Sequence, residues 1–237
     1  AGCGEAAPIP EAALTSTATP VTGVPDAPAL PVPLEVSGPG RYEAEVMSGG
    51  LARRFVLFVP AAAPDPAPLV IVFHGFTASP EAIEEASGFS AVAEAEGFLV
   101  AYPEGSGFPR RWLTARAQGE QDVALTRDLV ALVGREAAVD PDRVYAAGFS
   151  NGGGMAARLA CEAADLIAAV GPVAAAYPAD DCSPARPVPL AAIHGTDDRV
   201  VPYEGRGEGL PAVEEVTEWW GERNGCDPQA TATRVAA

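Results

Sequence analysis

The stretch Arg143-Val-Tyr-Ala-Ala-Gly-Phe-Ser-Asn-Gly152 decides the fold of this chain. Its first half, Arg143–Ala147, is typical of a buried strand, and the small residues after Gly152 are typical of a helix. The residues between them have the G-x-S-x-G spacing of a nucleophile elbow, a sharp turn from strand to helix that carries a serine. Glycines stand two residues to either side because side chains there would collide with the neighbouring strand and helix. The alternative is an ordinary glycine-rich turn. Ser150 is therefore the candidate nucleophile.

The composition limits the chemistry that this chain can perform. Its 237 residues, 48% of them hydrophobic, can bury one sizeable core but are too few for two ordinary enzyme domains. All 15 basic residues are arginines, which excludes a Ser-Lys dyad, a lysine Schiff base and a P-loop lysine. A net charge of -17 disfavours binding to nucleic acid or to an anionic membrane surface. The expected partner is a neutral or weakly charged substrate.

The first residues of the chain resemble the end of an export signal. Ala1-Gly2-Cys3 matches the end of a bacterial lipoprotein signal, in which the cysteine becomes lipid-modified, although a chance match is the alternative. No apolar run of about 18 residues is present, so we expect membrane contact only through a lipid anchor on Cys3, at the bacterial cell surface or outside the cell. Residues 4–40 contain eight prolines, which is typical of an extended tether. We therefore expect a lipoprotein-type N-terminus and Pro/Ala-rich linker over 1–40, and a folded domain over 41–237.

Three further cysteines lie in the expected domain. An exported protein can hold disulfides, which makes their spacing informative. Cys161 ends the helix after the elbow, and Cys182 lies in the polar loop after the next strand, so we expect these two to pair. Their bond would close a loop of about 20 residues and contribute roughly 3 kcal/mol. Cys226 is left without a partner.

Strand and helix patterns alternate after an initial hairpin. Residues Tyr42–Val46 and Arg53–Val59, joined by a turn at Ser48–Gly50, predict two antiparallel strands at one sheet edge. Further strands are expected at Pro68–Phe73, Gly97–Tyr102, Arg143–Ala147, Ile167–Val170 and Val188–Ile193. Helices are expected at Pro80–Glu96, Gln121–Glu136, Asn151–Cys161 and Ala212–Asn224. This order predicts an α/β domain with a mostly parallel, doubly wound sheet, whose ligand site lies at the carboxyl ends of the strands.

Three of these strand ends carry polar residues suited to a hydrolytic site. In an α/β-hydrolase, the oxyanion hole uses the amide after the nucleophile and one from the loop after the third strand. Asn151 and Phe76, or Thr77 in place of Phe76, are the candidates. Asp197 or Asp198, after the last expected strand, is the candidate acid that orients a catalytic histidine, with a solvated acidic turn as the alternative.

Several other residues admit two interpretations. Trp112 either lines an acyl or aryl pocket or anchors its loop. Asp122, at the start of a helix, favours the helix dipole and could be only a cap. Tyr203 could shape substrate access, whereas Trp219 and Trp220 are most simply core packing.

From about Arg41 to its end, the chain resembles the polyhydroxybutyrate depolymerase and feruloyl esterase family of exported α/β-hydrolases. The matching stretches are His74-Gly-Phe76, Gly148-Phe-Ser-Asn-Gly-Gly153, His194-Gly-Thr-Asp-Asp198 leading into Val201-Pro-Tyr203, and Glu218-Trp-Trp with Arg223-Asn-Gly-Cys226. The resemblance implies an α/β-hydrolase fold, a covalent acyl-enzyme on a serine, and no metal or organic cofactor. It also implies ester substrates, either a polyester or aryl esters on plant polysaccharide. Because the family motif ends on the triad acid, the resemblance selects Asp198 over Asp197.

The sequence departs from the family pattern near its C-terminal end. In the family, the catalytic histidine follows the acid after one more strand, and neither that stretch nor the implied partner of Cys226 occurs in this sequence. Of the two histidines, we expect His74 to brace its loop by hydrogen bonding, and His194 is a poor candidate for the base. We therefore expect an α/β-hydrolase domain that lacks its last strand and histidine loop, and nearly no activity from the polypeptide. The alternatives are a serine peptidase or dienelactone-type hydrolase on the same fold, or a surface binding module without the base.

Overall fold

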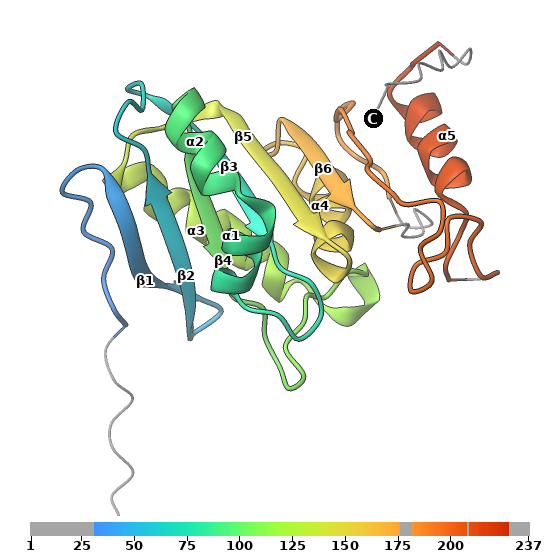
Figure 1. Ribbon diagram of the computed structural model, residues 1–237, viewed down its shortest axis with the longest axis horizontal. Helices are drawn as coiled ribbons and strands as arrows, with labels where there is room; N and C mark the ends of the chain where they lie inside the picture. The colour runs from blue at the N-terminus through green and yellow to red at the C-terminus, as the bar shows by residue number, and fades with distance from the viewer. Residues whose placement is uncertain (1–30, 176–181, 208, 228–237) are drawn as a thin grey trace, which may run out of the picture. The chain divides into compact units, whose positions relative to one another are not determined.

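A computed structural model describes residues 31–175, 182–207 and 209–227 (Figure 1). Cys3 and most of the expected linker lie outside these residues. Contacts divide the chain into Ala1–Leu30 and a compact unit, Pro31–Ala237. This unit begins ahead of Arg41, where the sequence placed the boundary, because Leu34 is buried in the core and the backbone of Val32 exchanges hydrogen bonds with Glu45.

The compact unit is built on one six-stranded sheet with the strand order β1-β2-β4-β3-β5-β6 (Figure 1). The strands are β1 (Gly40–Ser48), β2 (Leu51–Val59), β3 (Ala67–Phe73), β4 (Leu99–Pro103), β5 (Val139–Phe149) and β6 (Ala169–Val173). The predicted hairpin at one sheet edge is confirmed: β1 and β2 are antiparallel and turn on Gly49 and Gly50, which both have positive φ. Strand β2 pairs antiparallel with β4, and all other pairs are parallel, so the predicted mostly parallel sheet is also confirmed.

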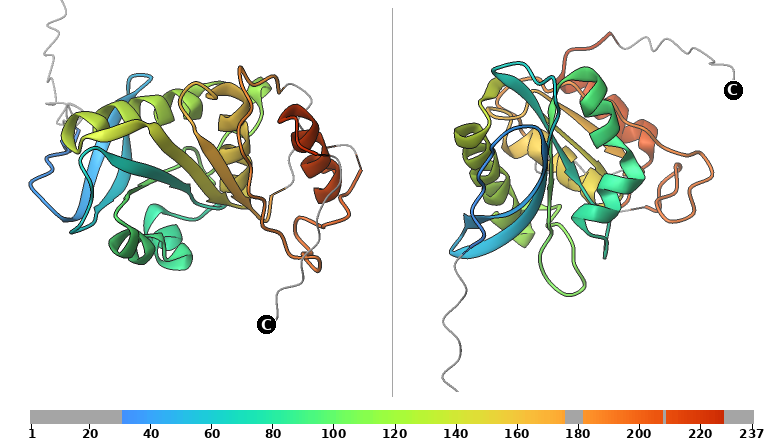
Figure 2. Two further views of the ribbon diagram at one scale, coloured as in Figure 1. Left: turned by 90° about the horizontal axis from the view of Figure 1, so that it is seen from above. Right: turned by 60° about the vertical axis from the view of Figure 1, so that its left-hand side comes forward.

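Helices cover both faces of the sheet (Figure 2). Helices α3 (Gln121–Glu136) and α4 (Asn151–Glu162) lie on one face, and α1 (Pro80–Ser87) and α2 (Phe89–Glu96) lie on the other. Because successive strand residues point to opposite faces, Ile71 packs in the larger core cluster with Leu129 and Leu159, whereas Val72 packs in the smaller one with Ile83. The 3-10 helix η1 (Arg116–Gln118) precedes α3, and α5 (Val213–Arg223) follows the last sheet segment. None of the described helices is long and apolar enough to cross a membrane.

Three elements differ from their predicted form. The helix predicted over Pro80–Glu96 is divided into α1 and α2 at Gly88, whose φ of 65° ends the first helix in a left-handed cap. Strand β6 begins two residues after Ile167, whose amide instead donates to the carbonyl of Ala163. The segment predicted as a strand over Val188–Ile193 pairs with β6 through two isolated parallel bridges, at Leu190 and Ile193, and through backbone hydrogen bonds such as that from Ala191 to Val170.

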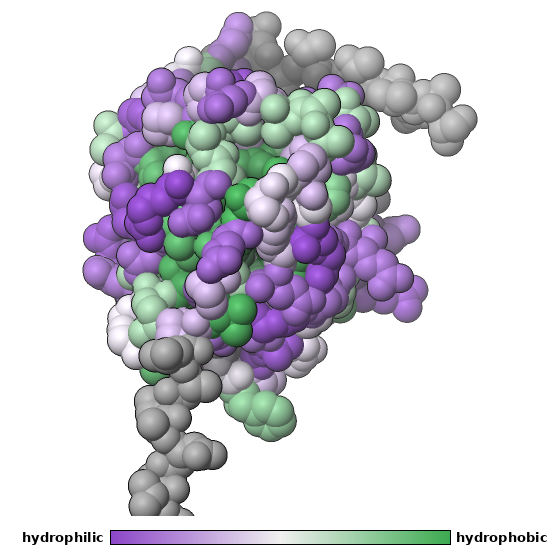
Figure 3. Space-filling view, turned by 90° about the vertical axis from the view of Figure 1, so that its left-hand side faces the viewer, coloured by the Kyte–Doolittle hydropathy of each residue, from purple (hydrophilic) through white to green (hydrophobic). Residues whose placement is uncertain are grey.

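Charged side chains protect the β1 edge of the sheet. In Figure 3, hydrophilic atoms cover much of the side of the molecule on which β1 lies. Arg41 of β1 forms ion pairs with Glu43 and with Glu84 of α1, and Arg54 of β2 pairs with Glu43 and Glu81. Charge on an edge strand opposes its pairing with another chain.

The expected disulfide between Cys161 and Cys182 is present, with the two Cα atoms 5.1 Å apart. It joins the end of α4 to the segment that follows β6. Cys226 is free and exposed.

Candidate active site

Ser150 occupies the sharp turn between β5 and α4, as the G-x-S-x-G pattern predicts. Its backbone has φ 54° and ψ -118°, a conformation that non-glycine residues rarely adopt. The amide of Ser150 donates to the carbonyl of Val173 on β6 (2.8 Å), and its carbonyl accepts from the amide of Gly154 (3.0 Å). The serine is thus held at the carboxyl edge of the sheet by hydrogen bonds on both sides.

The glycines around Ser150 are required by close backbone packing. A Cβ atom on Gly148 would collide with the carbonyl oxygen of Gly152, and one on Gly152 would collide with the carbonyl oxygen of Phe73. A Cβ atom on Gly153 would lie 3.0 Å from the carbonyl oxygen of Val173. The start of α4 therefore sits against the ends of three strands, which is the geometry of a nucleophile elbow.

Two amides next to Ser150 have no acceptor within the described chain. Asn151 is the first residue of α4, where the amide precedes the helical hydrogen-bond ladder and the helix dipole favours negative charge. In the loop after β3, the amide of Thr77 donates to the carbonyl of Arg110 (2.8 Å), whereas the amide of Phe76 donates to no acceptor within the described residues. Of the two alternatives for the second oxyanion amide, Phe76 is the one whose N–H is free in the part of the chain that the structure describes.

His74 braces the loop that carries Phe76. Its imidazole is fully buried, Nε2 accepts a hydrogen bond from the amide of Gly105 (2.9 Å), and Nδ1 lies 2.7 Å from the carbonyl oxygen of Gly75. Because Nε2 accepts, Nδ1 carries the proton and donates to Gly75, so the ring is neutral. Burial lowers the pKa of His74 below its usual value, which reinforces this state. Both nitrogens are engaged, so neither is free to act on Ser150.

The segment Glu104–Leu113 after β4, which we call the rim loop, is fixed to the elbow by Asn151. The side-chain oxygen of Asn151 accepts from the amide of Trp112 (2.7 Å), and its nitrogen donates to the carbonyl of Trp112 (3.1 Å). The buried indole of Trp112 donates to the carbonyl of His74 (2.9 Å) and packs edge-on against Phe73. Trp112 is therefore a loop anchor, and Asn151 combines a candidate oxyanion amide with a clamping side chain that the sequence did not reveal.

Two buried charged residues fix the end of the rim loop. Asp122 accepts hydrogen bonds from the amide of Leu113 (2.8 Å) and from the guanidinium of Arg53 (3.1 Å). It lies in the first turn of α3, where its charge favours the helix dipole, and the N-cap residue of that helix is Glu120. Arg158 donates to the carbonyl of Leu113 (2.7 Å) and forms a bidentate pair with Glu162. The roles of both residues depend on contacts distant in sequence.

The loop that begins at His194 and carries Asp198, which we call the acid loop, lies two strand positions from Ser150 along the carboxyl edge of the sheet. Phe149 is in register with Val173, which is in register with Ile193, so the loop that begins at His194 is separated from Ser150 by about 10 Å. Asp198 Oδ1 accepts from the amides of residues 200 and 201, and these bonds lower the pKa of its carboxyl. Within the described chain Oδ2 accepts no hydrogen bond, so one oxygen of an ionised carboxylate remains available.

No hydrogen bond joins Ser150 to a histidine or to Asp198 among the described residues. His194 Nδ1 lies 3.1 Å from the carbonyl oxygen of Gly195, its ring stacks edge-on with Tyr203 at 6.1 Å, and Nε2 has no partner there. The backbone carbonyl of Tyr203 accepts from the amide at the start of α5, which ties the acid loop to that helix. The described residues contain no cluster of three or more His, Cys, Asp or Glu that could hold a metal ion.

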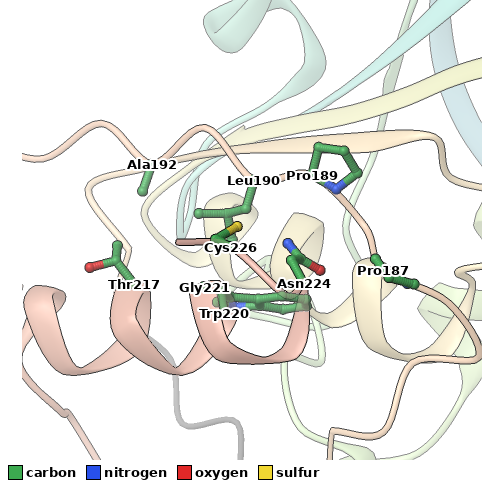
Figure 4. A pocket seen from close by; sticks show the side chains of 9 residues that line it. All are labelled: Pro187, Pro189, Leu190, Ala192, Thr217, Trp220, Gly221, Asn224 and Cys226. Carbon is green, nitrogen blue, oxygen red and sulfur yellow. The ribbon is translucent and has the colours of Figure 1, made fainter. Parts of the chain in front are cut away.

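A cavity of about 500 Å³ lies between α5 and the segment 187–192 (Figure 4). Trp220 and Asn224 of this region face the segment 187–192, and Asn224 exchanges two hydrogen bonds with the backbone of Val188. Trp220 is buried in the core, as predicted, and Trp219 carries Arg223 over its ring at 4.1 Å. None of the residues that line this cavity belongs to the elbow, to the acid loop, or to the loop after β3 that carries Phe76, which we call the oxyanion loop.

Comparisons with known proteins place the chain in a family of esterases. Residues 53–183, more than half of the chain, match the family described as "Esterase PHB depolymerase". A Nocardia uniformis subsp. tsuyamanensis protein named as an esterase is 37% identical over 172 residues, covering 68% of this chain and 49% of that protein. Feruloyl esterase B of Piromyces equi is 34% identical over 68% of this chain and 33% of its own. The poly(3-hydroxybutyrate) depolymerase of Ralstonia pickettii is 32% identical over 60% of this chain and 34% of its own. The chain thus spans between a third and a half of these relatives.

Solved structures confirm the fold. A thermostable esterase superposes with a TM-score of 0.60 at 20% identity, over 78% of this chain and 52% of its own. The acetyl xylan esterase from Aspergillus awamori superposes with a TM-score of 0.52 at 19% identity, over 56% and 50%. The sheet and its helices have the α/β-hydrolase arrangement predicted from the sequence.

Proposed function

This chain belongs to the PHB depolymerase family of esterases, and on that premise we propose that it hydrolyses carboxylic esters through an acyl-enzyme on Ser150. The observation that carries the proposal is the strained backbone of Ser150 at the elbow, where the amide of Asn151 follows it and the amide of Phe76, in the loop after β3, has no acceptor among the described residues. The hydroxyl of Ser150 attacks the ester carbonyl, the two amides stabilise the oxyanion, and the alcohol leaves. Water then attacks the acyl-serine and releases the acid.

Asp198 is the proposed triad acid. Its ionised carboxylate lies at the end of the last sheet segment and keeps one oxygen available, which suits a group that orients a histidine and stabilises its charged form. The chain order, serine before aspartate, is also that of the fold.

We further propose that neither His74 nor His194 is the general base in this mechanism. Both nitrogens of His74 are engaged by backbone groups, and His194 lies at the end of a segment two strand positions from Ser150. Without a base the serine hydroxyl stays protonated, and loss of a triad member lowers turnover by about 10⁴-fold to 10⁶-fold. The 237-residue polypeptide should therefore hydrolyse esters slowly.

The proposed substrates are the esters named in the relatives: a hydroxyalkanoate polyester, or a feruloyl ester. A net charge of -17 favours neutral esters over anionic ones.

Hydrolysis of p-nitrophenyl butyrate by the 237-residue polypeptide tests these proposals. We expect slow release of p-nitrophenol and an acyl adduct on Ser150 in the intact mass, both absent in Ser150→Ala and retained in the exposed control Ser183→Ala. Equal release by Ser150→Ala would refute the nucleophile. Turnover near 10 s⁻¹ that is lost in His194→Ala would instead refute the assignment of the base.

A further inference from the structure

We propose that Arg110, at the tip of the rim loop, is a positioning residue that fixes the direction of the Phe76 amide in the oxyanion loop. This inference rests on the proposed ester hydrolysis and adds a residue that acts on the oxyanion amide from a second loop. The rim loop projects beyond the carboxyl edge of the sheet, on the side where the parallel strands end (Figure 1).

The oxyanion loop is a four-residue turn from Gly75 to Ala78. The amide of Ala78 donates to the carbonyl of Gly75 (3.1 Å), which closes the turn. Its third residue, Thr77, has φ 66°, whereas Phe76 before it has no positive φ. This is the pattern of a type II turn, whose third position favours glycine. A threonine is strained there, so contacts from outside the turn must hold it.

Arg110 makes two of those contacts. Its backbone carbonyl accepts from the amide of Thr77 (2.8 Å), and its guanidinium donates to the carbonyl of Ala78 (3.0 Å). In a type I turn the peptide group between Phe76 and Thr77 is turned over, so the Thr77 amide would point away from Arg110. The contacts with Arg110 therefore select the type II form, in spite of the strain at Thr77.

The N–H of Phe76 belongs to a peptide group that this turn holds. The carbonyl oxygen of that group, on Gly75, accepts from the amide of Ala78 and lies 2.7 Å from Nδ1 of His74. Because a trans peptide is planar, with N–H opposite C=O, fixing the oxygen of Gly75 fixes the direction of the Phe76 N–H. Arg110 acts through Ala78 and Thr77 on this peptide group. An oxyanion donor is effective only when it is aimed in advance at the developing charge.

Arg110 is itself held against the sheet by Glu104. The guanidinium of Arg110 pairs with the Glu104 carboxylate at 2.8 Å. The backbone of Glu104 is tied to β2, since its amide donates to the carbonyl of Arg54 (2.9 Å) and its carbonyl accepts from the guanidinium of Arg53 (2.9 Å). Arg110 thus connects the sheet to the oxyanion loop through an ion pair at one end and two hydrogen bonds at the other.

The neighbouring Arg111 provides a matched control. Arg111 exchanges two backbone hydrogen bonds with Ser106, at 3.0 and 2.9 Å, and these close the hairpin that carries Arg110. Its side chain is exposed and forms no hydrogen bond or ion pair with the described part of the chain. Arg111→Ala therefore makes the same change of charge and size in the same loop, without touching the oxyanion loop.

Acylation of the 237-residue polypeptide by p-nitrophenyl butyrate tests the proposal, with the butyryl adduct followed by intact mass. Loss of an oxyanion donor lowers the rate by about 10²-fold to 10³-fold, and we expect the misaligned donor of Arg110→Ala to lower the rate constant at saturating ester about tenfold. KM should change less than about twofold, because this amide binds the transition state more strongly than the ester. Arg110→Lys should recover part of the loss, since an ammonium group can still donate to Ala78 but lacks the planar fork.

Hydrogen exchange of the amides in residues 74–79 tests the same role without any ester. In Arg110→Ala the tip is tied to the oxyanion loop by one backbone hydrogen bond, so we expect the Thr77 amide to exchange about tenfold faster. Glu104→Gln keeps the size of its side chain and its backbone contacts, and should show a smaller change in the same direction. Exchange within β3 and β5 should stay as in the unchanged chain, which separates a loosened turn from general unfolding.

The outcomes distinguish the positioning role from the proposed function. If Arg110→Ala matches Arg111→Ala in both acylation and exchange, Arg110 does not position the turn. A higher KM at an unchanged rate constant would also overturn the proposal, because it would mean that Arg110 binds the ester itself. If Ser150→Ala releases p-nitrophenol as fast as the unchanged chain, the proposed nucleophile is wrong, and exchange at Thr77 alone then decides whether Arg110 holds the turn.

Discussion

His74 is neutral in the folded chain, and its buried ring holds two loops of the site in place. Its neutral ring joins the oxyanion loop to the rim loop through Gly75 and Gly105, and burial keeps its pKa below the usual 6.5. The unfolded chain therefore binds a proton near pH 6.5 that the folded chain does not, so stability falls as the pH drops through 6.5 toward the folded pKa.

We expect the free energy of unfolding in urea to decrease between pH 7 and pH 5. In His74→Asn this decrease should be much smaller, whereas the exposed control Ser183→Ala should follow the unchanged chain. A decrease of the same size in His74→Asn would contradict the buried neutral state. The motif His-Gly alone indicated the bracing role, but not its second partner, because Gly105 lies 31 positions away.

At the scale of elements, the buried carboxylate of Asp122 joins α3 both to β2 and to the rim loop. Asp122 on the first turn of α3 satisfies both Arg53 of β2 and the amide of Leu113. Asp122→Ala removes a buried carboxylate from the half-buried guanidinium of Arg53 and from the amide of Leu113, and we expect a loss of about 3 kcal/mol in the free energy of unfolding. Asp128→Ala, on the same helix, should change it by less than about 0.5 kcal/mol. Equal losses in the two variants, measured by urea unfolding, would show that Asp122 is only a helix residue.

The elements with strong local signals could be predicted from the sequence, and those decided by distant contacts could not. Helix α3 has the predicted bounds because its apolar positions repeat at helical spacing. The break at Gly88 was missed because an isolated glycine is also compatible with a continuous helix. The clamp by Asn151 and the anchors Asp122 and Arg158 were missed because each acts on the rim loop, which is irregular and carries no periodic signal.

At the scale of the whole molecule, the disulfide ties α4 to the segment that follows β6 and leads toward the acid loop. The bond links residues 21 positions apart, so it restricts the unfolded chain and should stabilise the fold by about 3 kcal/mol. In urea unfolding, we expect the free energy of unfolding of the double variant Cys161→Ser/Cys182→Ser to be lower than that of the unchanged chain by this amount. Reductant should lower the free energy of unfolding of the unchanged chain equally. Cys226→Ser, which removes the free thiol, should change neither value. If reductant destabilises the double variant as much as the unchanged chain, the effect does not come from this bond, and the tie between α4 and the acid side of the sheet rests on packing alone.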